Sequence, residues 1–256
     1  EQGRISFGDN GGILTTGDLY VGKSQLSGTG TIKTSGIVGD MDICFDASHG
    51  SEHTFFINDI AIHLSQADSE DLGTGYVGEG TLVIKDGITV NSDEGFLGYY
   101  SGSTGIAFIE GEGSEWIMDN ELSVGLEGRG ELTITSGGSV RNDGASYVGD
   151  DSGSIGRVTV DGEGSAWTSY GLYIGCEGTG ELIITNGGKV TSDRDVVVGY
   201  DDEGDYGTGT VTLDGEGSTL LSRWLDVGDE YIPGVLNIFN GSTVSIRDTT
   251  YVGELG

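Results

Sequence analysis

The strongest constraint on the fold of this chain is an aliphatic residue followed by glycine, which recurs along most of the sequence. The residue before the glycine is aliphatic in all ten copies: Val21-Gly22, Val38-Gly39, Val77-Gly78, Leu97-Gly98, Val124-Gly125, Val148-Gly149, Ile174-Gly175, Val198-Gly199, Val227-Gly228 and Val252-Gly253. From Gly78 onward, successive glycines are 20, 27, 24, 26, 24, 29 and 25 residues apart. A period of about 25 residues is typical of a solenoid, in which each repeat is one supersecondary unit. The aliphatic residue is expected to face inward and to stack on its copies.

A second period, about twice as long, lies on top of the first. Four segments, 81–90, 131–140, 181–190 and 235–244, align without a gap and share the leucines Leu82, Leu132, Leu182 and Leu236. Between them a Gly-Glu-Gly-Ser turn precedes Trp116, Trp167 and Leu220. Two kinds of turn therefore alternate, and one sequence repeat corresponds to two rungs.

Hydrophobic residues within each rung alternate with a period of two. Leu132 and Ile134 are predicted to point inward, with Thr133 and Thr135 outward. Nothing in the chain sustains a helical period, and a rung of about 25 residues leaves no room for a crossover helix. The sequence therefore predicts an all-β, single-stranded parallel β-helix (β-solenoid) of about ten rungs, with equivalent strands stacked in parallel.

The chain is predicted to divide at residue 75. Residues 1–75 form an irregular part of the solenoid, in which Ile5 and Phe7 take inward positions. The stretch 39–78 forms an enlarged rung with a loop near 47–54. Residues 76–256 carry the regular repeats.

The aligned strings carry a resemblance to a known class of repeats. They are Val-Gly, Gly130-Glu-Leu-Thr-Ile-Thr-Ser-Gly-Gly-Ser-Val140 and Gly153-Ser-Ile-Gly-Arg-Val-Thr-Val-Asp-Gly-Glu-Gly-Ser-Ala-Trp167. They resemble the β-helical repeats of bacterial autotransporter passengers and PEP-CTERM-associated surface proteins, over about residues 75–256. Residues 28–50 are similar to the irregular lead-in of such proteins. The resemblance implies a right-handed solenoid that is secreted or held at the bacterial cell surface as a structural, matrix or adhesive element.

The strongly negative net charge of the chain argues against nucleic acid and membrane surfaces as partners. With 11 basic and 42 acidic residues the formal net charge is −31, which repels phosphate backbones and anionic lipid. No run of about 18 apolar residues is present, so direct membrane insertion is not expected. Nucleic acid and membrane surfaces are therefore not expected as partners.

Nucleophilic catalysis finds no support in the sequence, and a polysaccharide lyase that uses a pair of carboxylates is the less favoured alternative. No nucleophile lies at a recognisable spacing from an activating base, and Glu112, Glu163 and Glu216 recur with the repeat, as an architectural column does. His49 and His53 are interpreted as ordinary loop residues and His63 as an outward strand residue. The chain is predicted not to be an enzyme and to require no cofactor.

Calcium is the one ion for which the sequence offers ligands. Two equivalent turns two rungs apart carry acidic residues: Asp150, Asp151, Asp201, Asp202 and Asp205. Oxygen-rich flexible turns suit Ca²⁺. A solvated acidic surface is the favoured interpretation of these turns, and bound Ca²⁺ is the alternative.

Two aromatic sets are candidates for contact with a ligand. Trp116 and Trp167 share one position with Leu220, which favours a buried packing column over a sugar-stacking surface. Tyr99 and Tyr100 replace Asp150 and Asp151 in an equivalent turn and are predicted ligand contacts. Cys44 and Cys176 lie about six rungs apart, which excludes a disulfide within the chain and leaves one between subunits open.

The two ends of the chain are in phase with each other. The last residues follow a Val-Gly corner, and the first residues read as the strand that comes next in the repeat. The leading hypothesis is an extracellular structural protein whose copies stack head to tail into a filament or surface matrix. The alternative is a carbohydrate- or surface-binding adhesin segment of a longer passenger, with polysaccharide or cell-surface matrix as partner.

Overall fold

The computed structural model describes residues 3–65, 70–199, 201–202, 205–229 and 232–254. Over these residues the chain is almost entirely β-strand, with a single 3-10 turn, η1 (Lys23–Gln25). Within the same ranges, no helix has the length and apolar character needed to cross a membrane.

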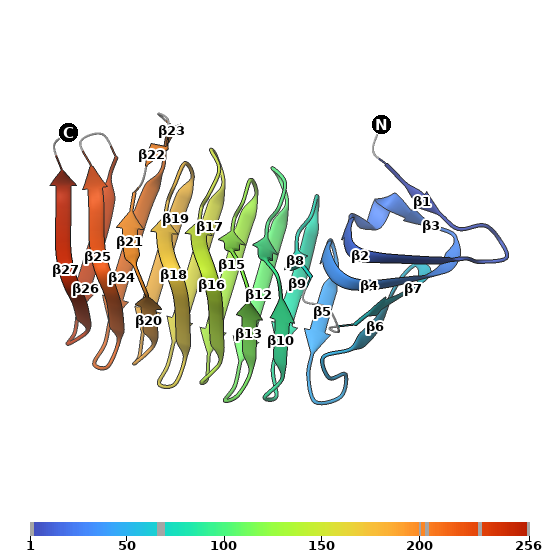
Figure 1. Cartoon of the computed structure of the whole chain (residues 1–256), viewed down its shortest axis with the longest axis horizontal. Helices are drawn as coiled ribbons and strands as arrows, with labels where there is room; N and C mark the ends of the chain where they lie inside the picture. Colours follow the sequence, from blue (N-terminus) through green and yellow to red (C-terminus); the bar gives the residue numbers. More distant parts are fainter. Residues whose placement is uncertain (1–2, 66–69, 200, 203–204, 230–231, 255–256) are drawn as a thin grey trace.

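Eight parallel strands form one wall of the molecule (Figure 1). They are β5 (Asp42–Phe45), β9 (Glu79–Ile84), β12 (Thr104–Glu110), β15 (Arg129–Thr135), β17 (Ile155–Asp161), β19 (Thr179–Thr185), β24 (Thr208–Asp214) and β26 (Gly234–Phe239). Each strand pairs with the equivalent strand of the next coil, so that Leu132 lies beside Val158 and Ile134 beside Val160.

A fifteen-stranded sheet forms the opposite wall. It contains β2 (Ile13–Val21), β4 (Thr29–Gly39), β6 (His53–Ile57), β7 (Asp59–Leu64), β8 (Leu72–Thr74), β10 (Thr89–Ser92), β11 (Gly95–Leu97), β13 (Glu115–Met118), β14 (Leu122–Val124), β16 (Ser139–Val148), β18 (Ala166–Ile174), β20 (Lys189–Ser192), β21 (Asp195–Val198), β25 (Thr219–Asp229) and β27 (Thr243–Glu254). Two small pairs complete the fold: β1 (Ile5–Ser6) with β3 (Leu26–Ser27), and β22 (Asp201–Asp202) with β23 (Asp205–Tyr206).

The chain passes from one wall to the other and back in each coil, as in the succession β15, β16, β17, β18. This confirms the predicted β-solenoid with stacked parallel strands. The coils number about nine turns, and the expected ten rungs and right-handed winding stay predictions.

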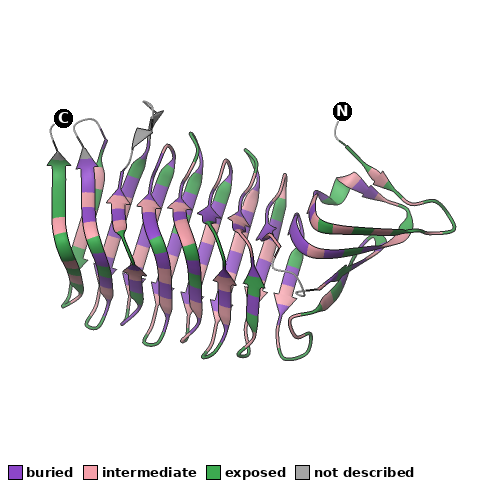
Figure 2. Cartoon of the chain, in the orientation of Figure 1, coloured by how far each residue is buried: buried purple, intermediate pink, exposed green. Residues whose placement is uncertain are grey.

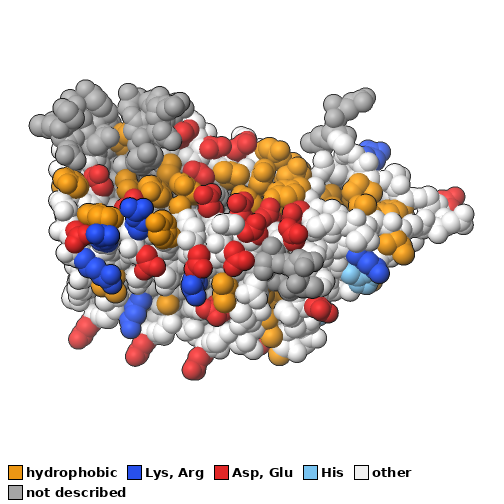
Figure 3. Space-filling view, in the orientation of Figure 1, with side chains coloured by type: hydrophobic (Ala, Val, Ile, Leu, Met, Phe, Trp, Pro, Cys, Tyr) orange, Lys and Arg blue, Asp and Glu red, His pale blue; other side chains and the backbone are white. Residues whose placement is uncertain are grey.

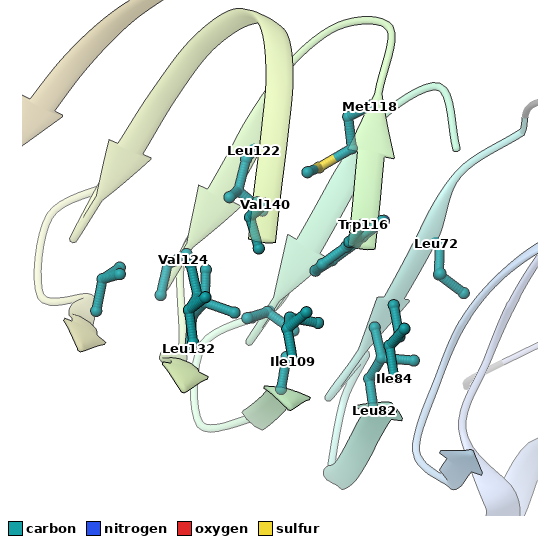
Figure 4. Packing of buried hydrophobic residues seen from close by; sticks show 14 of the residues in the cluster. Leu72, Leu82, Ile84, Ile109, Trp116, Met118, Leu122, Val124, Leu132 and Val140 are labelled. Carbon is teal, nitrogen blue, oxygen red and sulfur yellow. The ribbon is translucent and has the colours of Figure 1, made fainter. Parts of the chain in front are cut away.

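The core consists of stacked columns of inward side chains. One column holds Leu82, Ala107, Leu132, Val158, Leu182 and Val211, and the next holds Ile84, Ile109, Ile134, Val160, Ile184 and Leu213; all are fully or almost fully buried. In Figure 4, Leu82, Ile109 and Leu132 face Trp116 and Val140 across the interior. The predicted alternation of Leu132 and Ile134 with outward threonines is confirmed.

The tryptophans form a packing column, as predicted. Trp116 pairs with Val90 and Val140, and Trp167 pairs with Val140 and Val190. Both indoles are buried, and so is Leu220 at the third copy. A surface role for these residues in sugar stacking is therefore excluded.

The aliphatic-glycine column differs from the prediction at its N-terminal copies. Thr74, not Val77, pairs with Leu97, and Gly39 pairs with Thr74. Val77 lies in the following turn, where its amide donates to Asp40 Oδ1 at 3.0 Å. Thr74 is fully buried, so the column does admit a polar residue, because the Thr74 hydroxyl donates to the Met41 carbonyl at 3.4 Å.

The segment 53–64 also departs from a simple stack. It forms an antiparallel hairpin of β6 and β7, turned at Asn58, whose φ is +53°. His63 faces outward, as predicted, whereas His53 is the first residue of β6 and not part of the loop.

The Gly-Glu-Gly-Ser turns have a structural explanation. The hydroxyls of Ser114, Ser165 and Ser218 accept hydrogen bonds from the amides of Gly87, Gly137 and Gly187 in neighbouring coils, at 3.0–3.1 Å. A buried serine thus satisfies a backbone donor that a bare glycine turn leaves unpaired. The recurring glutamates belong to these structural turns.

Candidate functional site

The C-terminal coil, β26 and β27, exposes the column positions that are buried elsewhere. Ile238 is 49% exposed, whereas its neighbour Leu213 in the preceding coil is fully buried. Val252 is 74% exposed, compared with 6% for Val227 beside it. The exposed surface of β27 stands out at the end of the stack in Figure 2.

The same coil has a free backbone edge within the described part of the chain. There β26 pairs only with β24 and β27 only with β25. Because strand edges and apolar side chains both favour a further strand, this C-terminal face has the properties of an association surface.

The N-terminal face is built differently. In Figure 1, β2 and β4 run horizontally, along the long axis of the molecule. The strands from β9 to β27 run vertically, across that axis. Ile5 and Phe7 pack against the core as half-buried residues, and Ile13 at the start of β2 is exposed. Among the described residues β2 pairs only with β4, so the N-terminal part of the chain also has a free strand edge.

Tyr99 and Tyr100 belong to a cluster of five rings. The aromatic cluster consists of Tyr20, Tyr76, Phe96, Tyr99 and Tyr100, with neighbouring ring centroids 4.9–6.5 Å apart. Tyr100 is 40% exposed, while Tyr99 is half-buried among the other rings. Of the two predicted ligand contacts, Tyr100 is exposed and Tyr99 only partly so. A role of either tyrosine in ligand binding stays a prediction.

Sequence inspection missed three members of this cluster, Tyr20, Tyr76 and Phe96. A signal was present for Tyr20 and Phe96, since each directly precedes an aliphatic-glycine pair, and the parallel register places both in one outward column. Tyr76 lies instead in the turn after Thr74, where its carbonyl accepts a hydrogen bond from the Tyr100 amide at 3.1 Å.

Acidic side chains line one side of the aromatic cluster. The Tyr20 hydroxyl donates a short hydrogen bond to Asp71 Oδ2, and the Asp71 amide donates to Asp18 Oδ1 at 3.0 Å. Burial raises the pKa of Asp71, and the charge of Asp18 adds to that rise. Burial likewise raises the pKa of Glu94, assisted by the charges of Asp71 and Glu121.

Asp150 and Asp151 follow Gly149 in the turn that is equivalent to Tyr99 and Tyr100. The Asp150 amide donates to the Gly125 carbonyl at 2.9 Å, which fixes it in the stack. Burial, together with the charge of Asp151, raises the pKa of Asp150 to about 7, against the opposing hydrogen bond from Ser123. At neutral pH the Asp150 carboxyl group is therefore only partly ionised.

The structure does not test calcium binding at these turns. Asp201, Asp202 and Asp205 lie in the β22–β23 hairpin, and their side chains fall outside the described residues. Among the described side chains, no group of three or more His, Cys, Asp or Glu is arranged to hold a metal ion. The calcium site stays a prediction.

The Asp150→Asn substitution is expected to stabilise the protein at pH 8 but not at pH 4. The folded protein keeps the Asp150 proton up to about pH 7, whereas the unfolded chain loses it near pH 4. The stability this residue contributes is complete below about pH 4 and is lost as the pH rises through 7. A rise of about three pKa units corresponds to about 4 kcal/mol. Because Asp150 is only half-buried and solvent screens its charge, the gain at pH 8 should be smaller, on the order of 2 kcal/mol.

Thermal unfolding at both pH values, with and without calcium chloride, checks this expectation. An equal gain at pH 4 and pH 8 would contradict the ionic cause. If calcium instead stabilises the wild type and not the variant, Asp150 is a ligand, because a bound cation offsets the buried charge.

The histidines and cysteines lie apart from these surfaces. His49 Nδ1 lies 2.8 Å from Asp46 Oδ1, and the His49 and His53 rings are 4.3 Å apart. Burial raises the pKa of the half-buried Cys44 thiol, with the nearby Asp46 adding to the rise. Cys44 is half-buried and Cys176 is buried, and the two do not form a disulfide with each other.

No family model, curated protein or solved structure significantly matches this chain. The structure therefore supplies the fold, and any function is inferred from the surfaces described above.

Proposed function

We propose that this chain is a structural protein whose copies stack end to end, so that the C-terminal coil of one copy is covered by the N-terminal face of the next. The observation that carries the proposal is the exposure of column residues in β26 and β27. Covering Ile238 and Val252 contributes roughly 1.5–3 kcal/mol for each side chain fully buried.

Backbone pairing adds to this apolar contact. β27 spans Thr243–Glu254 and offers a long run of unpaired donors and acceptors along its outer edge. β2, with its own outer edge, is the receiving strand. Because the two contacting faces differ, the association is heterologous and extends into a filament when it does not close.

The filament or surface matrix is proposed to lie outside a bacterial cell, secreted or held at its surface. It is supported by the resemblance of the repeats to exported passengers and by the acidic surface, which keeps single copies soluble. No catalytic step is part of the proposal.

The Ile238→Asp substitution is expected to abolish assembly. It places a charge on the exposed C-terminal face, where desolvation on contact is costly, while the folded single copy tolerates it because the side chain is already 49% exposed. The matched control is Ile155→Asp on the lateral surface, where the isoleucine is 44% exposed.

Negative-stain microscopy and sedimentation velocity, with and without calcium, measure the outcome. Wild type and Ile155→Asp should form rods of many lengths, and Ile238→Asp only single copies. Monodisperse short rods of the wild type at high concentration overturn the proposal. Rods of exactly doubled length also contradict it, because they indicate pairing of two C-terminal faces.

A further inference from the structure

A groove on the outward surface of the fifteen-stranded sheet lies near its C-terminal end. Its volume is about 400 Å³, and its walls include Tyr170, Tyr173, Arg194, Asp195, Trp224 and Tyr251. These residues belong to β18, β21, β25 and β27 or to the corner between β20 and β21. The groove lies on the lateral surface, reaches β27 through Tyr251, and is separate from the aromatic cluster.

The groove exists because small and large residues follow each other along one outward column. Ala145 pairs with Gly171 in the register of β16 and β18, and Asp195 pairs with Trp224 in that of β21 and β25. The two small residues leave a hollow beside the large indole. Because the strands stack in register, small side chains in one coil lie beside a large side chain in another, and the surface between them is concave.

Polar contacts hold the walls of the groove in place. The Tyr173 hydroxyl donates to Asp195 Oδ2 at 3.0 Å, and Arg194 Nη1 donates to the Tyr170 hydroxyl at 3.1 Å. The Arg194 guanidinium also lies 5.5 Å from the centre of the Tyr170 ring and 5.7 Å from that of Trp224. The rings and the charged groups are therefore positioned before any ligand arrives.

We propose that this groove binds a neutral hexopyranose unit of a polysaccharide. Aromatic faces accept the C–H face of a sugar ring, and the carboxylate of Asp195 and the guanidinium of Arg194 can accept from and donate to its hydroxyls. The volume falls in the range of about 300–1,000 Å³ typical of small-molecule sites.

Charge selects a neutral sugar over an acidic one. Lys and Arg side chains gather toward the C-terminal end of the face seen in Figure 3, but the lining of the groove holds two carboxylates, Asp195 and Asp226, against one guanidinium, Arg194, and Arg223 pairs with Asp248 at 2.6 Å. The whole chain also carries a net charge of −31. A uronate in the groove would meet this repulsion, whereas a neutral hexose does not.

Aromatic side chains continue from the groove into the neighbouring coil of the stack. Tyr147 and Tyr173 stack with ring centroids 5.3 Å apart and planes at 17°, so the aromatic surface continues into the preceding coil. A polymer, rather than a single monosaccharide, is therefore the ligand that uses the whole surface.

Binding of purified oligosaccharides to the full chain tests the proposal. The probes are hexamers of β-1,4-glucose, β-1,4-mannose and β-1,4-galactose, with a galacturonate hexamer as the charged comparison, measured by calorimetry. We expect at least one neutral hexamer to bind and the galacturonate hexamer to bind at least tenfold more weakly.

Two variants locate the binding. Trp224→Ala removes one wall, and Gly171→Val fills the hollow; Gly171 has an ordinary backbone conformation, and an added Cβ would lie 3.3 Å from Tyr173 Cε2. Each should weaken binding of the neutral hexamer at least tenfold. Phe56→Ala, which removes an exposed aromatic ring from β6, outside the groove, should leave the affinity unchanged.

Three results would overturn the proposal: no neutral hexamer binds, galacturonate binds more tightly, or affinity is lost in Phe56→Ala and kept in Trp224→Ala. The circular dichroism spectrum and melting temperature show whether each variant is folded, and Tyr170→Ala, which alters an exposed ring, replaces any variant that is not. Filament formation is measured separately, so failure here leaves the end-to-end proposal standing, and the reverse also holds.

Discussion

Replacing Gly156 by alanine is expected to destabilise the solenoid by roughly 3 kcal/mol or more, at the upper end of what overpacking costs. A Cβ at this position would lie 2.1 Å from the Val124 carbonyl oxygen and 2.2 Å from the Gly149 amide nitrogen. Both atoms are backbone, so no side-chain movement can relieve the contact. The glycine is required by the close approach of the chain at the corner.

Gly153→Ala is the matched control three residues away. Gly153 has a φ of +81°, but no atom lies within 4 Å of the added Cβ. The Gly153→Ala substitution should therefore destabilise the protein only because alanine disfavours the left-handed conformation, by roughly 1–2 kcal/mol. Urea and thermal unfolding followed by circular dichroism compare the two variants, and equal losses would show that conformation, rather than close approach, constrains Gly156.

The two buried tryptophans are expected to respond differently to the same substitution. Trp116 Nε1 donates to Ser92 Oγ at 3.0 Å, whereas no described residue accepts a hydrogen bond from Trp167 Nε1. Both Trp→Leu variants lose packing, by roughly 2–4 kcal/mol. Trp116→Leu should cost about 1–3 kcal/mol more, because it also leaves the buried Ser92 hydroxyl without its partner.

The two indole N–H groups differ because different residues face them from the preceding coil. The residue equivalent to Ser92 is Asn142, whose amide donates to the Gly144 carbonyl and whose oxygen accepts from Ser146. Leucine already occupies the same column at Leu220, so both variants should fold. Equal unfolding free energies for Trp116→Leu and Trp167→Leu, or a larger loss for Trp167→Leu, would contradict the role of Ser92.

The regular part of the fold followed from the sequence because its determinants are local and repeated. Alternation at Leu132 and Ile134 assigns each residue to a face, and the repeat period assigns it to a column. The N-terminal copies were misaligned because Thr74 is polar and Val77 happens to precede a glycine. Correcting the position to Gly75 changes the first gap from 20 to 23 residues, close to the others.

The candidate surfaces were less accessible to sequence reasoning. Tyr99 and Tyr100 were found because they are adjacent in the chain, whereas Tyr20 joins them only through stacking of distant coils. The groove was missed altogether, since nothing in the sequence marks Gly171 and Trp224 as neighbours of the same hollow.

The sequence by itself determined which residues face inward and that equivalent strands stack in parallel, because a period of two within strands and of about 25 between them admits few other arrangements. The tertiary structure decided which outward residues meet. Neighbouring strands lie only about 4.8 Å apart, so a shift of one residue in register, or one added residue at a corner, changes the partners of every outward side chain. The aromatic cluster, the half-buried Asp150 and the groove at Trp224 all depend on that register.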